Sequence, residues 1–246
     1  RPENREMFSA GNENLSINLF LNQMNSDMKA VLEFLTELRQ NNNREWFTAN
    51  RSRYETCRDK FLFITEVLIN EIRKFDPEVP AMDPKDCLFR IYRDVRFSAD
   101  KSPYKTNFGS YISRGGRKSV RAGYYFHIDP QGSFAGGGIY MPAPDVLKAL
   151  RTAIYEHPED YLAIVNDPGF RRYFSEFSGE MLKTAPKGFP ADFEHIELLR
   201  RESYSFGTEI DQETLLRGDF VEKLMDAFRE LYKMNHFLNE ALDNYL

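Results

Sequence analysis

The sequence predicts an α+β fold with a mostly antiparallel sheet at about residues 87–141, packed by N- and C-terminal helices. Two observations support this class. Apolar residues recur every three to four positions on both sides of that region, as on one face of a helix. Inside it the period changes to two, and aromatic and β-branched residues alternate between Gly, Ser and Pro turns. Helices that flank a block of strands are typical of an α+β fold.

Regular helical periodicity begins near residue 26. Ser26 or Asp27 is placed to cap the first helix, and a second, longer helix follows, with its helical spacing ended by Asp76-Pro77. We expect residues 1–25 to be an N-terminal extension outside the core, and residues 26–246 to form a single α+β domain.

Turn residues separate the expected strands. Asp129-Pro130-Gln131-Gly132 has the chemistry of a type I turn and is expected to join the last two strands into a hairpin. A late strand is expected at 202–210, and further helices begin near Pro144, Asp167 and Asp219. The strands expected in the main block are 88–97, 107–113, 123–129 and 133–141.

Composition indicates an ordinary soluble globular protein. The 246 residues are 41% hydrophobic, which is enough for a full core without disulfides. No apolar run approaches the roughly 18 residues of a membrane span, and a secretory signal pattern is lacking, so we expect no membrane and a cytoplasmic location. Two cysteines form neither a disulfide framework nor a CxxC site, so Cys57 and Cys87 are expected to be buried free thiols.

Basic residues are concentrated in one part of the chain. Between Lys85 and Arg121, ten basic residues stand against three acids, so this window carries +7 in a chain of formal net charge −5. The remainder therefore carries −12. A basic region in an acidic protein indicates either an anion-binding site or a set of internal ion pairs.

A regular strand at 88–97 would place Arg90, Tyr92 and Arg96 on one face, beside a turn rich in lysine and tyrosine. Arg and Lys bind carboxylate or phosphate, and Tyr offers a hydroxyl group and a ring face. The alternative is that Asp94 and other acids pair with these cations in surface bridges that contribute little. The predicted ligand-binding residues are Arg90, Tyr92, Arg93, Arg96, Lys101, Tyr104 and Lys105.

Arg93 falls on the other face of that predicted strand, which should point into the core. An isolated buried charge is disfavoured, so we expect Arg93 to be buried and paired with an acid, unless a β-bulge re-aims it. Such a pair would either tie the sheet to a helix or form the floor of the anion pocket. The apolar residues on the same face are Phe89, Ile91, Val95 and Phe97.

Other motifs favour packing over chemistry. Gly136-Gly137-Gly138 lies within a predicted strand, so close packing is favoured over a nucleotide-binding loop. His127 alternates with aromatic residues and is expected to be a satisfied core histidine. The polar cluster around His195 lacks metal-ligand spacing. We therefore predict no metal and no cofactor, and the sequence assigns no catalytic residue.

Three segments resemble a known family. FRIYRDVRFSADKSPYKTNF, GYYFHIDPQGSFAGGGIYMP and the earlier NNNREWFTANRSRY are similar to the domain of unknown function 2461 family of bacteria and fungi. The resemblance extends from about Phe34 to Leu242 and leaves out residues 1–25. It implies no established activity, cofactor or catalytic residue, so the function must be argued from the residues.

The sequence favours binding of a small phosphorylated or carboxylated ligand on a basic, Tyr-rich sheet face, by a binding protein or an enzyme. Single-stranded nucleic acid is the alternative partner, because six of thirteen tyrosines lie in or beside the basic region and aromatic rings stack on bases. The overall pI near 5.6 weighs against it. A structural or protein-interaction domain is the third interpretation.

Overall fold

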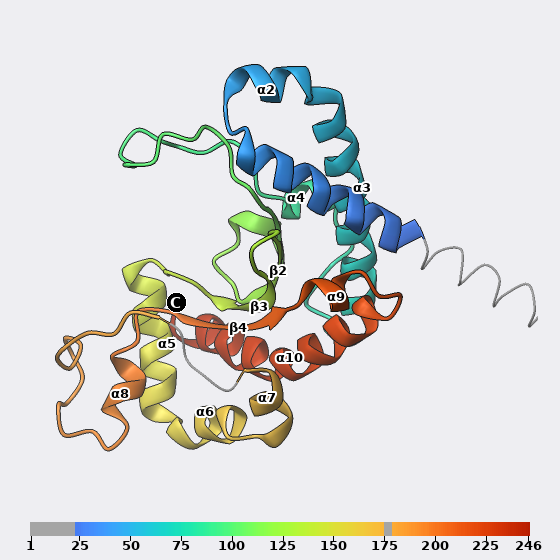
Figure 1. Ribbon diagram of the computed structural model, residues 1–246. Coiled ribbons are helices and arrows are strands. Elements are labelled where there is room, and N and C mark those ends of the chain that lie inside the picture. Colours follow the sequence, from blue (N-terminus) through green and yellow to red (C-terminus); the bar gives the residue numbers. More distant parts are fainter. Residues whose placement is uncertain (1–22, 175–178) are drawn as a thin grey trace, which may run out of the picture.

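The computed structural model describes residues 23–174 and 179–246 (Figure 1). A first helix occupies residues 23–40. The later helices are α2 (Arg44–Ala49), α3 (Arg51–Ile72), α4 (Pro84–Cys87), the 3₁₀ helix η1 (Gly116–Lys118), α5 (Pro144–Glu156), α6 (Pro158–Val165), α7 (Pro168–Tyr173), α8 (Ile196–Leu199), α9 (Gln212–Leu215) and α10 (Phe220–Tyr245). The strands are β1 (Phe108–Ile112), β2 (Gly123–Ile128), β3 (Ser133–Ile139) and β4 (Tyr204–Ile210). The predicted α+β class is confirmed.

The sheet has the order β1-β2-β3-β4, and each pair of neighbours is antiparallel. The expected turn joins β2 to β3: the Gly132 N–H donates to the Asp129 carbonyl at 3.1 Å, and the Gln131 N–H donates to the Asp129 carboxylate at 2.8 Å. The late strand is confirmed as β4, which pairs with β3 and forms the far edge. Helices from both ends of the chain pack on this sheet (Figure 1).

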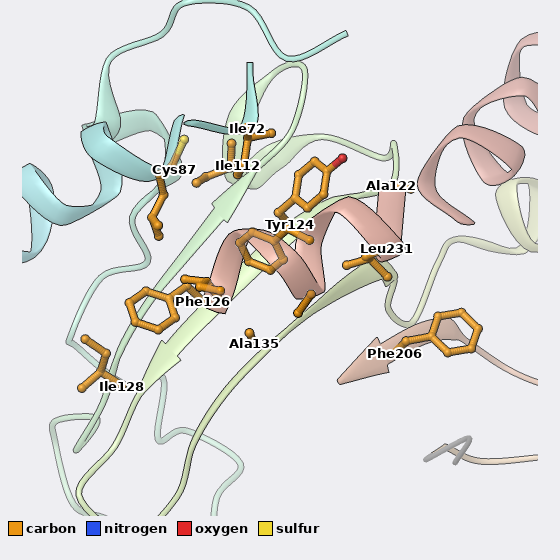
Figure 2. Close-up of a cluster of buried hydrophobic side chains, with 14 of the residues drawn as sticks. Ile72, Cys87, Ile112, Ala122, Tyr124, Phe126, Ile128, Ala135, Phe206 and Leu231 are labelled. Carbon is orange, nitrogen blue, oxygen red and sulfur yellow. The ribbon is translucent and has the colours of Figure 1, made fainter. Parts of the chain in front are cut away.

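One face of the sheet, the covered face, lies against α3 and α10. Tyr124, Phe126 and Ile128 alternate along β2 and are at most 1% exposed. Figure 2 shows these three side chains on the same side of β2, with Leu231 of α10 nearby. Burying large apolar and aromatic side chains is the main favourable contribution to folding, and this face supplies much of it.

Two buried asparagines of α10 fix its position on the sheet. Asn235 accepts a hydrogen bond from the Gly138 N–H at 3.1 Å and donates one to the Gly123 carbonyl at 3.0 Å. Asn239 accepts from the Ala122 N–H at 2.9 Å. A Cβ at Gly137 would lie 2.7 Å from Leu231, so the packing interpretation of the glycine triplet is supported.

The expected strand at 88–97 is wrong. Residues 88–107 instead form an irregular hairpin, here called the arm, which projects away from the helices (Figure 1). An isolated bridge at Tyr92–Tyr104 connects its two sides, and another at Leu88–Ser110 joins its start to β1. An isolated two-stranded hairpin is only marginally stable, and Asp94, whose carboxylate accepts from the Arg96 N–H at 3.3 Å, turns the chain before the strand can continue.

The expectation of a core Arg93 is wrong for the same reason. Phe97, on the face that was expected to be buried, is 98% exposed, whereas Ile91 is buried. The Arg93 side chain is 26% exposed and forms an ion pair with Asp100, whose side chain is 60% exposed. Its partner is therefore an acid of the same arm, and no buried acid among the described residues pairs with it.

The first helix also differs from its expected start. It already includes residues 23–25, and residues 1–22 lie outside the described part of the chain. Asp27 does not cap this helix. Its buried carboxylate accepts from Gln23 at 2.8 Å and forms an ion pair with Lys60 of α3. The pair joins the first helix to α3.

Both cysteines are buried free thiols, as predicted. Burial raises the pKa of Cys57 to about 11 and that of Cys87 to about 12, so neither thiol is activated for nucleophilic chemistry. Within residues 23–174 and 179–246, no helix is long and apolar enough to cross a bilayer.

Candidate anion-binding face

The side of the sheet opposite α3 and α10 is here called the open face. The register places Gly109, His127, Phe134 and Glu209 in one row across the strands, and Tyr111, Tyr125, Gly136 and Gly207 in the next. Tyr125, His127 and Phe134 are half-buried, whereas Gly207 and Glu209 are exposed. Aromatic side chains on this face are therefore available to contact a ligand.

The root of the arm, formed by Phe89, Arg90 and Lys105, lies next to the open face. The Lys105 ammonium lies 5.5 Å from the centre of the Phe89 ring, and that ring meets Tyr125 edge-on at 6.1 Å. Partial burial lowers the pKa of Lys105, and the positive charge of Arg90 lowers it further. The Lys105 N–H donates to the Ile91 carbonyl at 2.7 Å, so Lys105 lies across the root from Arg90 and beside the aromatic ring of Phe89.

Neither Arg90 nor Lys105 forms an ion pair within the described part of the chain. A lysine whose pKa is lowered by a neighbouring cation gains most from an anion that neutralises both charges. Arg supplies a planar fork of donors and Lys a compact charge, and both suit carboxylate or phosphate oxygens. The root therefore has the chemistry of an anion site.

Tyr125 and His127 form a hydrogen-bonded pair on the open face, with 2.9 Å between the Tyr125 hydroxyl and His127 Nδ1. The His127 ring stacks on Phe134 at 4.6 Å. A Cβ at Gly109 would lie 2.5 Å from the Tyr125 hydroxyl, so Gly109 leaves the space that this ring occupies. Packing and a hydrogen bond together fix the imidazole.

Burial lowers the pKa of His127; Asp129 opposes this effect and Lys105 adds to it. The Phe89 N–H donates to the Gly109 carbonyl at 3.0 Å, and Gly109 pairs with His127 in the sheet, so the root of the arm joins the sheet beside His127. His127 is therefore a half-buried residue of the open face, and the expectation of a core histidine is corrected. Its alternation with Tyr124, Phe126 and Ile128, which form the covered face, is the sequence pattern that could have placed it there.

The charged side chains in the tip of the arm, residues 93–102, form their contacts with other residues of the tip. The Arg96 guanidinium donates two hydrogen bonds to the Asp94 carboxylate, from Nε at 3.0 Å and from Nη2 at 2.7 Å. Lys101 donates to the Val95 carbonyl at 3.0 Å, and Arg93 pairs with Asp100. These cations have partners within a few residues, so the surface-bridge interpretation holds for Arg93 and Arg96.

The two predicted tyrosines belong to an aromatic cluster between the arm and α2. Tyr104 is buried and stacks on Phe47 at 3.9 Å, and Tyr92, which is half exposed, approaches the Tyr104 ring at 5.5 Å. Asn42 accepts from the Tyr104 N–H at 3.1 Å and donates to the Tyr104 carbonyl at 2.9 Å. Tyr104 therefore anchors the arm, and the seven predicted residues do not share one surface.

Other parts of the described chain offer weaker candidates for a ligand-binding or metal-binding site. A hollow of about 200 Å³ is lined in part by Asp86, Gly116 and Arg117. Arg117 donates there to the carbonyls of Lys85 and Asp86, at 2.8 and 2.9 Å, and so serves to hold the loop on α4. Among residues 23–174 and 179–246, no three His, Cys, Asp or Glu side chains gather as a metal site requires.

The fold and the face define an α+β protein whose open sheet face lies beside two cations that have no ion-pair partner among the described residues. The profile of the family DUF2461, described as a conserved hypothetical protein, matches residues 30–237, and the chain belongs to this family. No curated protein and no solved structure matches the chain. We therefore infer the function of this chain from the side chains of the open face.

Proposed function

We propose that the protein binds a small phosphorylated or carboxylated ligand on the open face, at the root of the arm. The observation that carries this proposal is the placement of Arg90 and Lys105 on the two sides of the root, where the Lys105 N–H donates to the carbonyl of Ile91, the residue after Arg90, at 2.7 Å. Neither cation has an ion-pair partner among the described residues. An anion between them would neutralise two like charges at once, and charge-assisted hydrogen bonds are stronger than neutral ones. The nearby rings of Phe89 and Tyr125 would contact the organic part of the ligand.

Contacts within the tip reduce the number of predicted residues that are available to bind a ligand. Arg93, Arg96 and Lys101 are occupied within the tip, and their use by a ligand would require breaking those contacts. Arg90 and Lys105 require no such rearrangement. The ligand site that we propose is therefore the root and the neighbouring side chains of the open face.

A thermal-shift screen of phosphorylated and carboxylated metabolites tests this function. A ligand that binds only the folded protein at about 100 times its Kd should add about 2.7 kcal/mol to the free energy of unfolding. The double variant Arg90→Ala/Lys105→Ala should abolish the shift, and Arg96→Ala at the tip is the matched control that should retain it. A flat screen, or an equal shift in the double variant, would contradict the proposal.

Single-stranded nucleic acid is a second candidate, favoured by one observation. Tyr92 and Phe97 expose their rings on a basic arm, at 44% and 98%, and exposed aromatic rings among cations can stack on bases. This function predicts that affinity for an oligonucleotide falls steeply between low and moderate salt and that Phe97→Ala weakens it. Binding that depends on Arg90 and Lys105 but not on Phe97 would favour the small ligand.

A further inference from the structure

His127 has one nitrogen engaged and one available. The Tyr125 hydroxyl has His127 Nδ1 as its hydrogen-bond partner, and we assign the hydroxyl as the donor because it has no other acceptor among the described residues. Nδ1 then accepts, and in the neutral ring Nε2 carries the hydrogen. Within the described residues Nε2 has no hydrogen-bond partner. The open face therefore presents an N–H donor.

This donor lies near the cations of the root. The Lys105 ammonium lies 5.5 Å from the centre of the Phe89 ring, that ring lies 6.1 Å from the Tyr125 ring, and the Tyr125 hydroxyl is 2.9 Å from His127 Nδ1. The charge of Lys105 also lowers the pKa of His127. The guanidinium, the ammonium and the imidazole N–H come from the arm and from β2, and all three are donors. The imidazole also has little freedom to turn away, because Phe134 and Tyr125 hold its ring.

We infer that His127 is a third contact of the bound anion and that the site selects phosphate monoesters over carboxylates. This inference rests on the proposed function. A carboxylate carries one negative charge, and the lone pairs of its two oxygens lie in one plane, so the Arg90 fork and the Lys105 ammonium can engage it along that plane and a donor from another direction gains little. A phosphate monoester offers three terminal oxygens and a second negative charge at neutral pH. Three donors therefore match the phosphoryl group better.

The same arrangement makes the affinity for the anion depend on the protonation of His127. The lowered pKa of free His127 keeps the ring neutral at neutral pH, and a dianion beside Nε2 would raise that pKa. Affinity should then rise as pH falls through the raised pKa of the complex, until free His127 also becomes protonated. The charged and titratable groups around the imidazole are Arg90 and Lys105 of the arm, Tyr125 of its own strand, Asp129, which pairs with Arg39 at 3.1 Å, and Glu209 of β4.

Calorimetry with phenyl phosphate and benzoate tests the selectivity, because both probes carry the same ring. At about pH 7.5, where a phosphate monoester is mainly a dianion, wild type should bind phenyl phosphate at least about tenfold tighter than benzoate. His127→Phe keeps a ring on Phe134 but has no donor, and should lose about ten- to one-hundredfold in phenyl phosphate affinity, with benzoate affinity unchanged. His127→Gln restores a donor and should recover part of the loss.

Inorganic sulfate, whose charge is constant over about pH 5 to 8, tests the linked proton. Wild-type affinity for sulfate should rise as pH falls, and His127→Gln should remove that dependence while it keeps a donor. Thermal melts of each variant confirm that it is folded. Unchanged phenyl phosphate affinity in His127→Phe, or equal affinity of wild type for the two aryl probes, would overturn the inference and leave the proposed function standing. Binding of neither probe by wild type would overturn both.

Discussion

The two sides of β2 share one backbone and differ in what their side chains contact. Tyr124, Phe126 and Ile128 are sealed against α3 and α10, while Tyr125 and His127, which alternate with them, stay half-buried beside the cations of the arm. Because successive side chains of a strand point to opposite faces, one segment can stabilise the fold with one face and offer side chains for ligand contact on the other. Substitutions on the two sides should therefore change different properties.

The largest effect is expected on the covered face. Phe126→Ala removes a ring that is 1% exposed and stacks near Phe61, and should lower the free energy of unfolding by about 3–5 kcal/mol in urea melts. Phe134→Ala, one strand away on the open face, is the matched control and should lose less than half as much. Similar losses in the two variants would remove the distinction between the faces.

The next effect concerns the hydrogen bonds that attach α10 to the covered face. Asn235→Ala leaves the buried Gly138 N–H and Gly123 carbonyl without their partner and should cost about 1–3 kcal/mol of unfolding free energy. Asn244→Ala, at an exposed position of the same helix, should stay within about 0.5 kcal/mol. Equal urea midpoints for the two variants would show that these hydrogen bonds do not stabilise the fold.

A substitution on the open face should affect the site more than the stability. The added methyl group in Gly109→Ala would meet the Tyr125 hydroxyl at 2.5 Å and displace the ring from His127. We expect a loss of about 1 kcal/mol in stability and weaker phenyl phosphate binding by calorimetry. Gly207→Ala is the control, since its Cβ would meet Phe134 at an ordinary 3.8 Å. Unchanged binding by Gly109→Ala would contradict a role for the Tyr125–His127 pair.

The smallest effect on stability is expected at the tip. Arg93→Ala should leave the urea midpoint unchanged, because its partner Asp100 is largely exposed and the tip lies outside the core. Arg121→Ala provides the contrast: that side chain is 15% exposed and pairs with both Glu78 and Asp243, so its loss should be measurable. A marked destabilisation by Arg93→Ala would show that the arm contributes to the cooperative fold.

Asp100 also gives the tip a pH dependence. Hydrogen bonds from Ser102, and then Arg93, lower the pKa of Asp100 to about 2. The ionised form is therefore favoured in the ordered tip, so this contribution is present above the usual pKa of about 3.9 and is lost as pH falls toward 2. In Arg93→Ala the Asp100 pKa should rise part of the way to its usual value, as measured by carboxyl NMR. No change would exclude the ion pair.

The four strands of the sheet could be predicted because aromatic and β-branched residues stand between turn residues, and in β2 the alternation also matches the burial. The segment 88–97 alternates in the same way, yet only isolated bridges form in the arm. Alternation shows which residues would suit a half-buried strand, and it does not show whether a partner strand or helix is present. The fold class was therefore predictable from the sequence, and the arm was not.

The candidate site was predictable in part for a related reason. The sequence identifies the cations of the arm, but their pairing depends on turns, such as the one that brings the Asp94 carboxylate to Arg96. Only the folded chain shows that Arg90 and Lys105 stay without such partners among the described residues. The alternation along β2 could have placed His127 on the open face, but its neighbours Gly109 and Phe134 are known only from the register of the three strands.

The asparagine contacts of α10 also restrict how this helix can assemble with the sheet. A surface of Leu, Met and Phe side chains would tolerate a slide by one helical turn, because apolar contacts have little directionality. Asn235 and Asn239 meet backbone groups of Ala122, Gly123 and Gly138, and a displaced helix would leave those groups unpaired in a dry interface. The last helix of the chain therefore has one docking position on the sheet.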